Sequence, residues 1–164
     1  MADDKTGFMS QLGYLSMAAR MKRLSDHIMH SARQFYRSEG IDIEPNWYLV
    51  FLLLKERKCM SITEMGEALH FAHPTVITLV RKMHSNGYLT FHSDPNDSRR
   101  QLVRLSEKAV DKLQLFEKMW HAAYESVREL FQGNGQFLAQ LDELLAHYEE
   151  TDFKTRTENA LNHE

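Results

Sequence analysis

The chain has 164 residues, of which 43% are hydrophobic and 26% are charged, so it can bury one compact core, and intrinsic disorder is excluded as its default state. Its single cysteine excludes an intrachain disulfide, no apolar run approaches the about 20 residues of a membrane span, and no secretory signal opens the chain, so we expect a cytoplasmic protein. The net charge of −3 is uneven, because residues 70–108 carry six Lys or Arg against three Asp or Glu whereas residues 109–164 carry five against eleven.

The first part of the chain predicts two helices of different character. Apolar residues recur at helical spacing from Phe8 to Phe35, and Gly40 offers a stop, so we expect one long amphipathic helix. Pro45 then opens a shorter segment, 47–54, that is almost wholly apolar. Because this segment has little polar surface to give to water, we expect it to be a buried core helix.

Two short helices joined by a tight turn are expected next. Ser61 and Glu64 have the spacing of a capping box, in which each side chain satisfies a backbone N–H of the other at a helix start. This helix should end near Leu69, and Pro74 restarts helical structure a few residues later. Gly87 ends the second helix with a left-handed cap, so the pair has the sequence form of a helix-turn-helix.

A hairpin and two further helices complete the chain. Residues 88–92 and 100–105 have strand character, and the turn formers at 94–97 separate them. Ser106 then caps a long helix, and a last helix covers 137–148. The outer helices carry more apolar surface than the small central unit covers, so we expect them to pair with a second copy of the chain.

The second helix of the turn unit has a face suited to the DNA major groove. Its apolar side chains fall on one side and should pack inward: Val76, Leu79, Val80 and Met83. Small hydroxyl groups and a cation fall opposite, with three residues at the shoulders: Thr75, Thr78, Lys82 and Ser85, then Pro74, Ile77 and Arg81. Such a face allows close approach to base edges and phosphates. An ordinary amphipathic surface helix has the same pattern, so this helix alone does not decide the function.

The tip of the hairpin favours DNA. Arg99 and Arg100 are adjacent there, and two guanidiniums suit insertion into the minor groove or contact with phosphates. Asp97, two residues before Arg99, is placed to hold that side chain extended. The alternative is a solvated charged loop. The position of the tip, directly after a helix-turn-helix and before a capped long helix, favours the DNA interpretation.

From Ser61 to Ala109 the sequence resembles the multiple-antibiotic-resistance regulator (MarR) family of bacterial winged-helix repressors. The two matching blocks read ITEMGEALHFAHPTVITLVRKMHSNGYL and DPNDSRRQLVRLSEKA. The second block is the more specific, since it has the family's Asp-x-Arg followed by Leu-Thr/Ser at Asp97, Arg99, Leu105 and Ser106. The flanking helices agree in order and length, so the resemblance extends over nearly the whole chain.

This resemblance implies a mainly α fold with a small β-hairpin wing, in which the end helices hold a homodimer on double-stranded DNA with a pseudo-palindromic sequence. The implied parts are an N-terminal dimerisation helix at 1–37, a winged helix-turn-helix at 45–105, C-terminal dimerisation helices at 106–150 and a flexible tail at 151–164. The implied DNA contacts are His73, Pro74, Thr75, Ile77, Thr78, Arg81 and Lys82 on the recognition helix and Asp97, Arg99 and Arg100 on the wing. Many members have Ser and Arg where this chain has Ala72 and Thr78, so no operator preference is carried over.

The resemblance also implies release from DNA by a small aromatic or phenolic anion bound between the dimer helices and the winged unit. The residues expected to line such an effector site are Arg20, His27, Trp47, Tyr48 and Met65. Each of them has a structural alternative. For Trp47, which adjoins a continuous apolar run, packing in the core is the favoured interpretation.

Other signals and other classes of protein are less favoured by the sequence. His27 with His30 and His70 with His73 are spaced as pairs, but a zinc site needs further ligands, so we expect no metal and no cofactor. Cys59 reads as a small buried residue rather than a redox sensor, and family members that sense peroxide carry their cysteine near the N-terminus. No catalytic motif is present, so we expect no enzyme. The main alternative is a winged-helix regulator that acts through protein partners or through a metal or redox signal.

Overall fold

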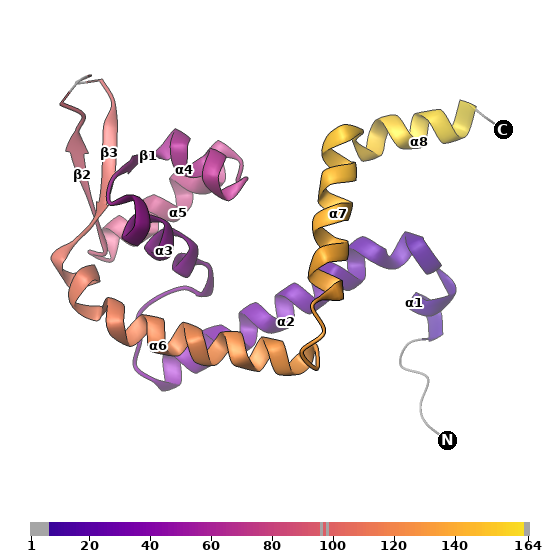
Figure 1. The fold of residues 1–164 in the computed structure, drawn as a ribbon, viewed down its shortest axis with the longest axis horizontal. Helices are drawn as coiled ribbons and strands as arrows, with labels where there is room; N and C mark the ends of the chain where they lie inside the picture. The colour runs from indigo at the N-terminus through magenta and orange to yellow at the C-terminus, as the bar shows by residue number, and fades with distance from the viewer. Residues whose placement is uncertain (1–6, 96, 98, 163–164) are drawn as a thin grey trace. The chain divides into compact units, whose positions relative to one another are not determined.

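The computed structural model describes residues 7–95, 97 and 99–162 (Figure 1). Helices dominate it, and the three strands form one small antiparallel sheet, so the expected fold class is confirmed. In chain order the elements are α1 (Gly7–Gln11), η1 (Gly13–Ser16), α2 (Met17–Ser38), η2 (Pro45–Trp47), α3 (Tyr48–Arg57), β1 (Met60–Ser61), α4 (Ile62–Leu69), α5 (His73–Ser85), β2 (Leu89–Ser93), β3 (Gln101–Leu105), α6 (Glu107–Leu130), α7 (Gln136–Glu150) and α8 (Phe153–Asn162). Within the described ranges, no helix has the length and hydropathy that a membrane crossing requires.

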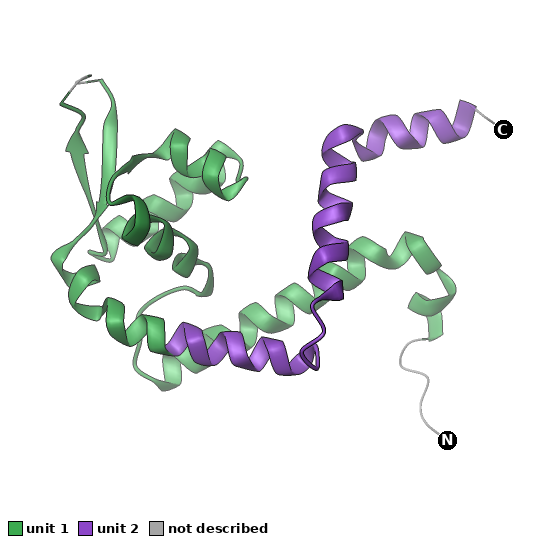
Figure 2. Ribbon diagram, in the orientation of Figure 1, with its two compact units in different colours: residues 1–118 green, residues 119–164 purple. Residues whose placement is uncertain are grey.

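The chain divides into two compact units, residues 1–118 and 119–164, with the boundary inside α6 (Figure 2). The first unit holds α1 to the start of α6 and contains the sheet. Its N-terminal part differs from the single long helix that the sequence predicts, because the backbone of Gly13 has a φ of +51° and separates α1 from η1 and α2. The buried Ser16 donates a hydrogen bond of 2.7 Å to the carbonyl of Gly13 and stabilises this break.

The turn unit has the boundaries that the sequence predicts. At the start of α4, the N–H of Glu64 donates to Ser61 Oγ at 3.3 Å, and the N–H of Ser61 donates to Glu64 Oε2 at 2.8 Å, so the capping box is confirmed. Pro74 lies in the first turn of α5. Gly87, with a φ of +76°, reverses the chain after α5, and the N–H of Tyr88 then bonds the carbonyl of Met83 at 3.0 Å.

Strands β2 and β3 form the expected hairpin, and β1 adds a third strand on the other side of β3 (Figure 1). In the register of the hairpin, Leu89 pairs with Leu105 and Phe91 pairs with Val103. Strand β1 is only two residues long, and Ser61 pairs there with Leu102. Because β1 ends where α4 begins, its pairing fixes the start of α4 against the wing.

An aromatic cluster forms the centre of the first unit. Phe51 of α3, Tyr88 and Phe116 of α6 are fully buried, and their rings meet edge to face with centroids 5.4 to 5.9 Å apart. Trp47 adds a fourth ring, 5.9 Å from Tyr88. Burying such a side chain stabilises the fold by about 1.5 to 3 kcal/mol. The cluster therefore fixes α3, the base of the hairpin and the first part of α6 to one another, as expected for a core helix at 47–54.

A polar network covers one side of this cluster. Tyr88 Oη donates a hydrogen bond to Asp42, and Lys108 Nζ lies 3.1 Å from Asp42 Oδ2 and 4.0 Å from the centre of the Tyr88 ring. Burial first, and then the neighbouring Asp42 carboxylate, raise the pKa of Tyr88. Burial acts to raise the pKa of Asp42, but the hydrogen bonds from Tyr88 and Lys108 prevail and lower it. The loop after α2 is thereby connected to α6 and to the base of the hairpin.

The second unit is helical and has little core of its own. No residue of α7 or α8 is buried. Many of its large apolar side chains are exposed: Tyr124, Leu130, Phe137, Leu138, Leu144, Leu145, Tyr148, Phe153 and Leu161. Residues 153–162, which the sequence predicts to be a flexible tail, form α8. Asp152 explains this difference, since its Oδ1 accepts a hydrogen bond of 2.8 Å from the N–H of Thr155 and caps the helix.

Candidate nucleic-acid interface

Helix α5 has the inward and outward faces that its sequence predicts. The inward side chains are at most 5% exposed: Val76, Leu79, Val80 and Met83. The outward side chains are exposed, except for Ile77, which is half-buried: His73, Pro74, Thr75, Thr78, Arg81, Lys82 and Ser85. The buried face holds α5 in the core, and the exposed face is left for a partner.

The exposed face of α5 borders two different hollows. His73, Ile77 and Arg81, spaced four residues apart, line a hollow of about 900 Å³ together with the start of α4 and the wing. Thr78 and Lys82 line a second hollow, of about 580 Å³, together with α2 and η2. Helix α5 therefore presents one edge to the wing and the other edge to the N-terminal helix α2.

The cations of this face are available to an anionic partner. Arg81 and Lys82 are exposed, and within the described residues neither side chain forms an ion pair. Thr78 differs, because its hydroxyl already donates to the carbonyl of Pro74 at 2.9 Å. The two cations have the freedom that contacts to phosphate oxygens require.

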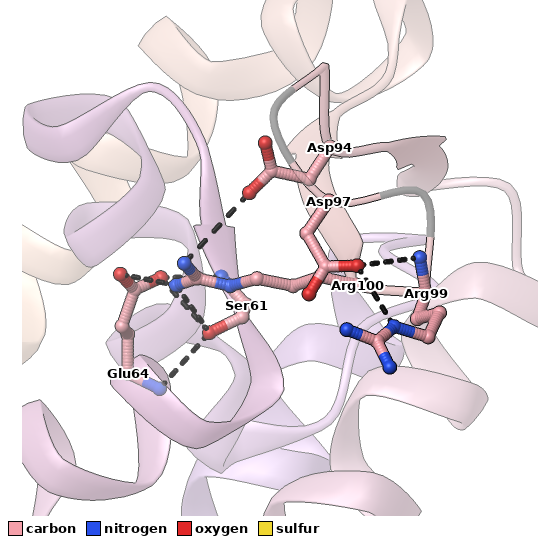
Figure 3. Close-up of polar contacts among 6 residues, drawn as sticks. All are labelled: Ser61, Glu64, Asp94, Asp97, Arg99 and Arg100. Carbon is pink, nitrogen blue, oxygen red and sulfur yellow. Dashed lines mark hydrogen bonds and ion pairs between the residues drawn. The ribbon is translucent and has the colours of Figure 1, made fainter.

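At the wing tip, Arg99 extends into solvent and is held by Asp97. The Arg99 side chain is 92% exposed, and Asp97 Oδ1 accepts hydrogen bonds from its backbone N–H at 3.0 Å and its Nε at 3.3 Å (Figure 3). The structure thus contains the contact between these two residues that the sequence predicts. Ser98, between them, lies outside the described residues. Arg99 also lines the hollow beside α5, so its charge lies on the same surface as that of Arg81.

Arg100, which the sequence treats like Arg99, has different surroundings. Its Nη2 lies 2.5 Å from Glu64 Oε1 and 3.2 Å from Ser61 Oγ, and its Nη1 lies 3.7 Å from Asp94 Oδ2 (Figure 3). The side chain is 43% exposed. Of the two adjacent guanidiniums, one therefore projects from the tip and the other contacts the beginning of α4.

These contacts keep Glu64 ionised over a wide pH range. The pKa of Glu64 is lowered to about 2, first by the backbone N–H of Ser61 and then by the Arg100 guanidinium and the Ser61 hydroxyl. The hydrogen bond and the charge of Glu64 in turn raise the pKa of Arg100. Both members of the pair are therefore charged at neutral pH.

The five residues predicted to bind an effector have different surroundings. Trp47 is the member of that set that lines the hollow between α2 and α5, where the ion pair of Arg33 with Glu44, 3.0 Å long, also lies. Met65 is fully buried, and Arg20 bonds the carbonyl of Met9 at 2.6 Å. His27 is exposed, and Tyr48 is 37% exposed. No local pattern marks Arg33 or Glu44, because they meet only where α2 packs beside η2.

The other chemical candidates remain isolated. Among the residues that the structure describes, no group of three or more His, Cys, Asp or Glu side chains is placed to hold a metal ion. Cys59 is half-buried and free. His70 ends α4 with a left-handed backbone, at a φ of 52°, so it has a structural role in the turn.

Taken together, the turn unit, the exposed face of α5 and the hairpin with its cationic tip define a winged helix-turn-helix domain. Residues 43–100 match the model of the MarR family. Members of the family are transcriptional regulators and not enzymes.

Similar proteins are found among both curated sequences and solved structures. The organic hydroperoxide resistance transcriptional regulator of Bacillus subtilis (strain 168) is 32% identical over 71 residues, which cover 39% of this chain and 48% of the relative. The chain thus matches about half the length of this curated relative. A MepR–DNA complex from S. aureus has a TM-score of 0.68 at 17% identity and covers 79% of this chain and 96% of its own. NadR in complex with 4-hydroxyphenylacetate has a TM-score of 0.57 at 15% identity, and the match covers 83% of this chain and 94% of the NadR chain. At such identities the two structures show a common fold.

Proposed function

We propose that the protein is a sequence-specific DNA-binding transcriptional regulator that represses genes by binding a pseudo-palindromic operator as a homodimer. One observation carries this proposal. Arg81 of α5 and Arg99 of the wing, 18 positions apart in the sequence, line the same hollow beside the recognition helix. Helix α5 and the wing thus each bring a cation to one surface. A protein that contacts DNA phosphates along both grooves of a duplex needs such an arrangement.

In the proposed complex, α5 enters the major groove and Arg99 enters the adjacent minor groove. The narrow minor groove has a negative potential that favours a guanidinium. Asp97 holds the guanidinium of Arg99 in place. The proposed DNA contacts are His73, Pro74, Thr75, Ile77, Thr78, Arg81, Lys82, Asp97 and Arg99. The similarity to the S. aureus MepR–DNA complex supports this arrangement.

We propose a homodimer because exposed apolar side chains occur on both the N-terminal and C-terminal helices. On α2, residues 36 to 44% exposed include Met17, Met21, Leu24 and Phe35. Helix α7 adds Leu138, Leu144, Leu145 and Tyr148. Segments 1–37 and 106–150 are the proposed dimerisation regions, and 45–105 is the proposed DNA-binding domain. A two-fold dimer presents its recognition helices about 34 Å apart, one turn of DNA, which corresponds to a pseudo-palindrome.

Release by a small aromatic or phenolic anion is the proposed signal. The hollow between α2 and α5 is lined by the buried Trp47 and by two cations, Lys82 and Arg33, of which Arg33 is paired with Glu44. NadR, which has a similar fold, was solved with 4-hydroxyphenylacetate. A ligand in this hollow would contact α5 directly, so it would compete with the DNA-bound position of that helix. A redox signal at Cys59 is the second candidate, favoured by the name of the B. subtilis relative.

Genomic footprinting of the purified protein tests the proposal. We expect protection of discrete two-fold-related sites, and loss of that protection on adding salicylate-like anions. If aromatic anions leave protection intact and mild oxidation removes it in the wild type but not in Cys59→Ser, the redox signal replaces the ligand. If no duplex sites are protected, DNA binding is wrong, and the domain instead serves contacts with proteins.

A further inference from the structure

We propose that Arg100 is a positioning residue: through Glu64 it fixes the wing to the start of α4, and so holds Arg99 where it meets DNA. The DNA part of this inference rests on the function proposed above. It differs from the sequence-based expectation, in which Arg99 and Arg100 contact DNA side by side.

The geometry places Arg100 at a junction of three segments. Its guanidinium meets Glu64 in the first turn of α4, Ser61 at the end of β1, and Asp94, which follows β2 (Figure 3). Arg100 itself immediately precedes β3. The guanidinium therefore connects both arms of the hairpin to the helix-turn-helix.

Backbone hydrogen bonds close the hairpin at the same level. The N–H of Asp94 donates to the carbonyl of Arg100 at 2.9 Å, and the N–H of Arg100 donates to the carbonyl of Asp97 at 2.9 Å. Beside them, Ser61 pairs with Leu102 across β1 and β3. The contacts of the Arg100 side chain with Ser61 and Glu64 join the same two segments nearer to the tip. They therefore limit how far the tip turns away from α4.

Glu64 divides its two oxygens between two tasks. Its Oε2 accepts from the backbone N–H of Ser61 in the capping box, and its Oε1 accepts from Arg100. Because both oxygens are engaged, the start of α4 and the wing share one carboxylate. Because these contacts already order the wing in the free protein, the wing loses less conformational entropy when it binds DNA.

Charge also separates the two arginines. Arg100 faces the carboxylates of Glu64 and Asp94, so much of its charge is already compensated. To reach a phosphate, it would have to leave Glu64 as an uncompensated anion facing DNA. Among the described residues, Arg99 forms an ion pair with Asp97 alone, and its side chain is 92% exposed, so its charge is far more accessible than that of Arg100.

Glu64→Gln is the decisive variant, because Gln still serves in a capping box while the ion pair with Arg100 is lost. Glu67→Gln is its matched control. Glu67 lies on the same helix, lines the same hollow and, among the described residues, has no ion pair. Electrostatics alone predicts that both variants bind DNA more tightly, since each loses a negative charge. If Arg100 positions the wing, Glu64→Gln should instead weaken DNA binding. The expected loss of affinity is roughly two- to fivefold, which corresponds to the free energy of a partly exposed ion pair.

Hydrogen exchange without DNA gives a second readout. We expect Glu64→Gln and Arg100→Gln to speed exchange of the backbone amides at positions 94 and 100, and Arg99→Gln to leave them unchanged. This readout stands even if the wild type binds no duplex, an outcome that would remove the proposed function but not the attachment of the wing. A double-mutant cycle completes the test: in the Glu64→Gln background, Arg100→Gln should add little further loss of affinity.

Two results would overturn the proposal. One is Glu64→Gln binding DNA as tightly as Glu67→Gln, with unchanged amide exchange in the wing. The other is Arg100→Gln lowering the salt dependence of binding as much as Arg99→Gln does, with the same loss in both Glu64 backgrounds, since Arg100 would then be a DNA contact in its own right.

Discussion

Asp97 holds Arg99 at two points, because one carboxylate oxygen accepts from both the backbone N–H and the side-chain Nε of Arg99. The second contact is 3.3 Å long and lies at a tip where the arginine is almost fully exposed. A pair this exposed adds little to the stability of the fold. Its effect is to narrow the range of directions that the guanidinium adopts, so it is a feature of the binding surface.

The first prediction concerns this arginine. Arg99→Ala should weaken duplex binding and reduce the slope of log affinity against log salt by about one, because one phosphate or minor-groove cation is lost. Fluorescence anisotropy over a salt series measures both effects. The stability of the free protein should not change. A slope equal to that of the wild type would remove Arg99 from the interface.

The second prediction concerns the capping box. Ser61→Ala removes the acceptor for the N–H of Glu64 at the start of α4, and it should lower the free energy of unfolding by about 1 kcal/mol. Ser85→Ala is the control, since the Ser85 hydroxyl is exposed and bonds only within its own helix. Urea denaturation should show the difference between the two variants. Equal midpoints would mean that the cap does not stabilise the fold.

The third prediction concerns pH. The pKa of Glu64 is about 2 in the folded protein and 4.5 in its ordinary state, so folding favours the ionised form. Its contribution to stability is therefore complete above about pH 4.5 and is lost as the pH falls toward 2. The difference in stability between the wild type and Glu64→Gln should be constant near neutrality and should shrink below pH 4.5. Because the side chain is 44% exposed, solvent screening keeps this difference small. A difference that grows on acidification would contradict the assignment.

The fourth prediction concerns the base of the wing. Tyr88→Phe keeps the aromatic cluster and removes only the hydroxyl that donates to Asp42. We expect a loss of about 1 kcal/mol in the free energy of unfolding, since Asp42 remains half exposed and keeps Lys108 as a partner. Thermal and urea unfolding measure this loss. Its absence would show that the hydroxyl bond is replaced by water at no net cost.

Much of the winged unit was predictable because its signals are local. Ser61 and Glu64 interact within one turn, Gly87 ends a helix by its own backbone freedom, and Ser106 accepts from the N–H of Ala109 three residues later. The burial of Val76 and Met83 follows from helical spacing. Such interactions join residues a few positions apart, so the sequence pattern contains them.

The features that the sequence did not predict depend on residues far apart in the chain. Arg100 meets Glu64 across 36 positions, and β1 is visible only once β3 lies beside it. The break of the first helix at Gly13 also differs from the sequence-based prediction, because the apolar period continues through it. For the effector residues, the sequence allows Trp47 both a core and a binding role. The packing of α2 against η2 places Trp47 beside a hollow that α5 also lines.

The most direct test of the central claim is the affinity of the variant Arg81→Glu with Arg99→Glu for the duplex upstream of its own gene, measured by anisotropy beside the wild type. Both residues are exposed, so the variant should fold and assemble as the wild type does. If α5 and the wing together form the DNA-binding surface, affinity should fall by at least about tenfold at constant salt, because two cations become anions facing phosphates. An affinity equal to that of the wild type would contradict the account.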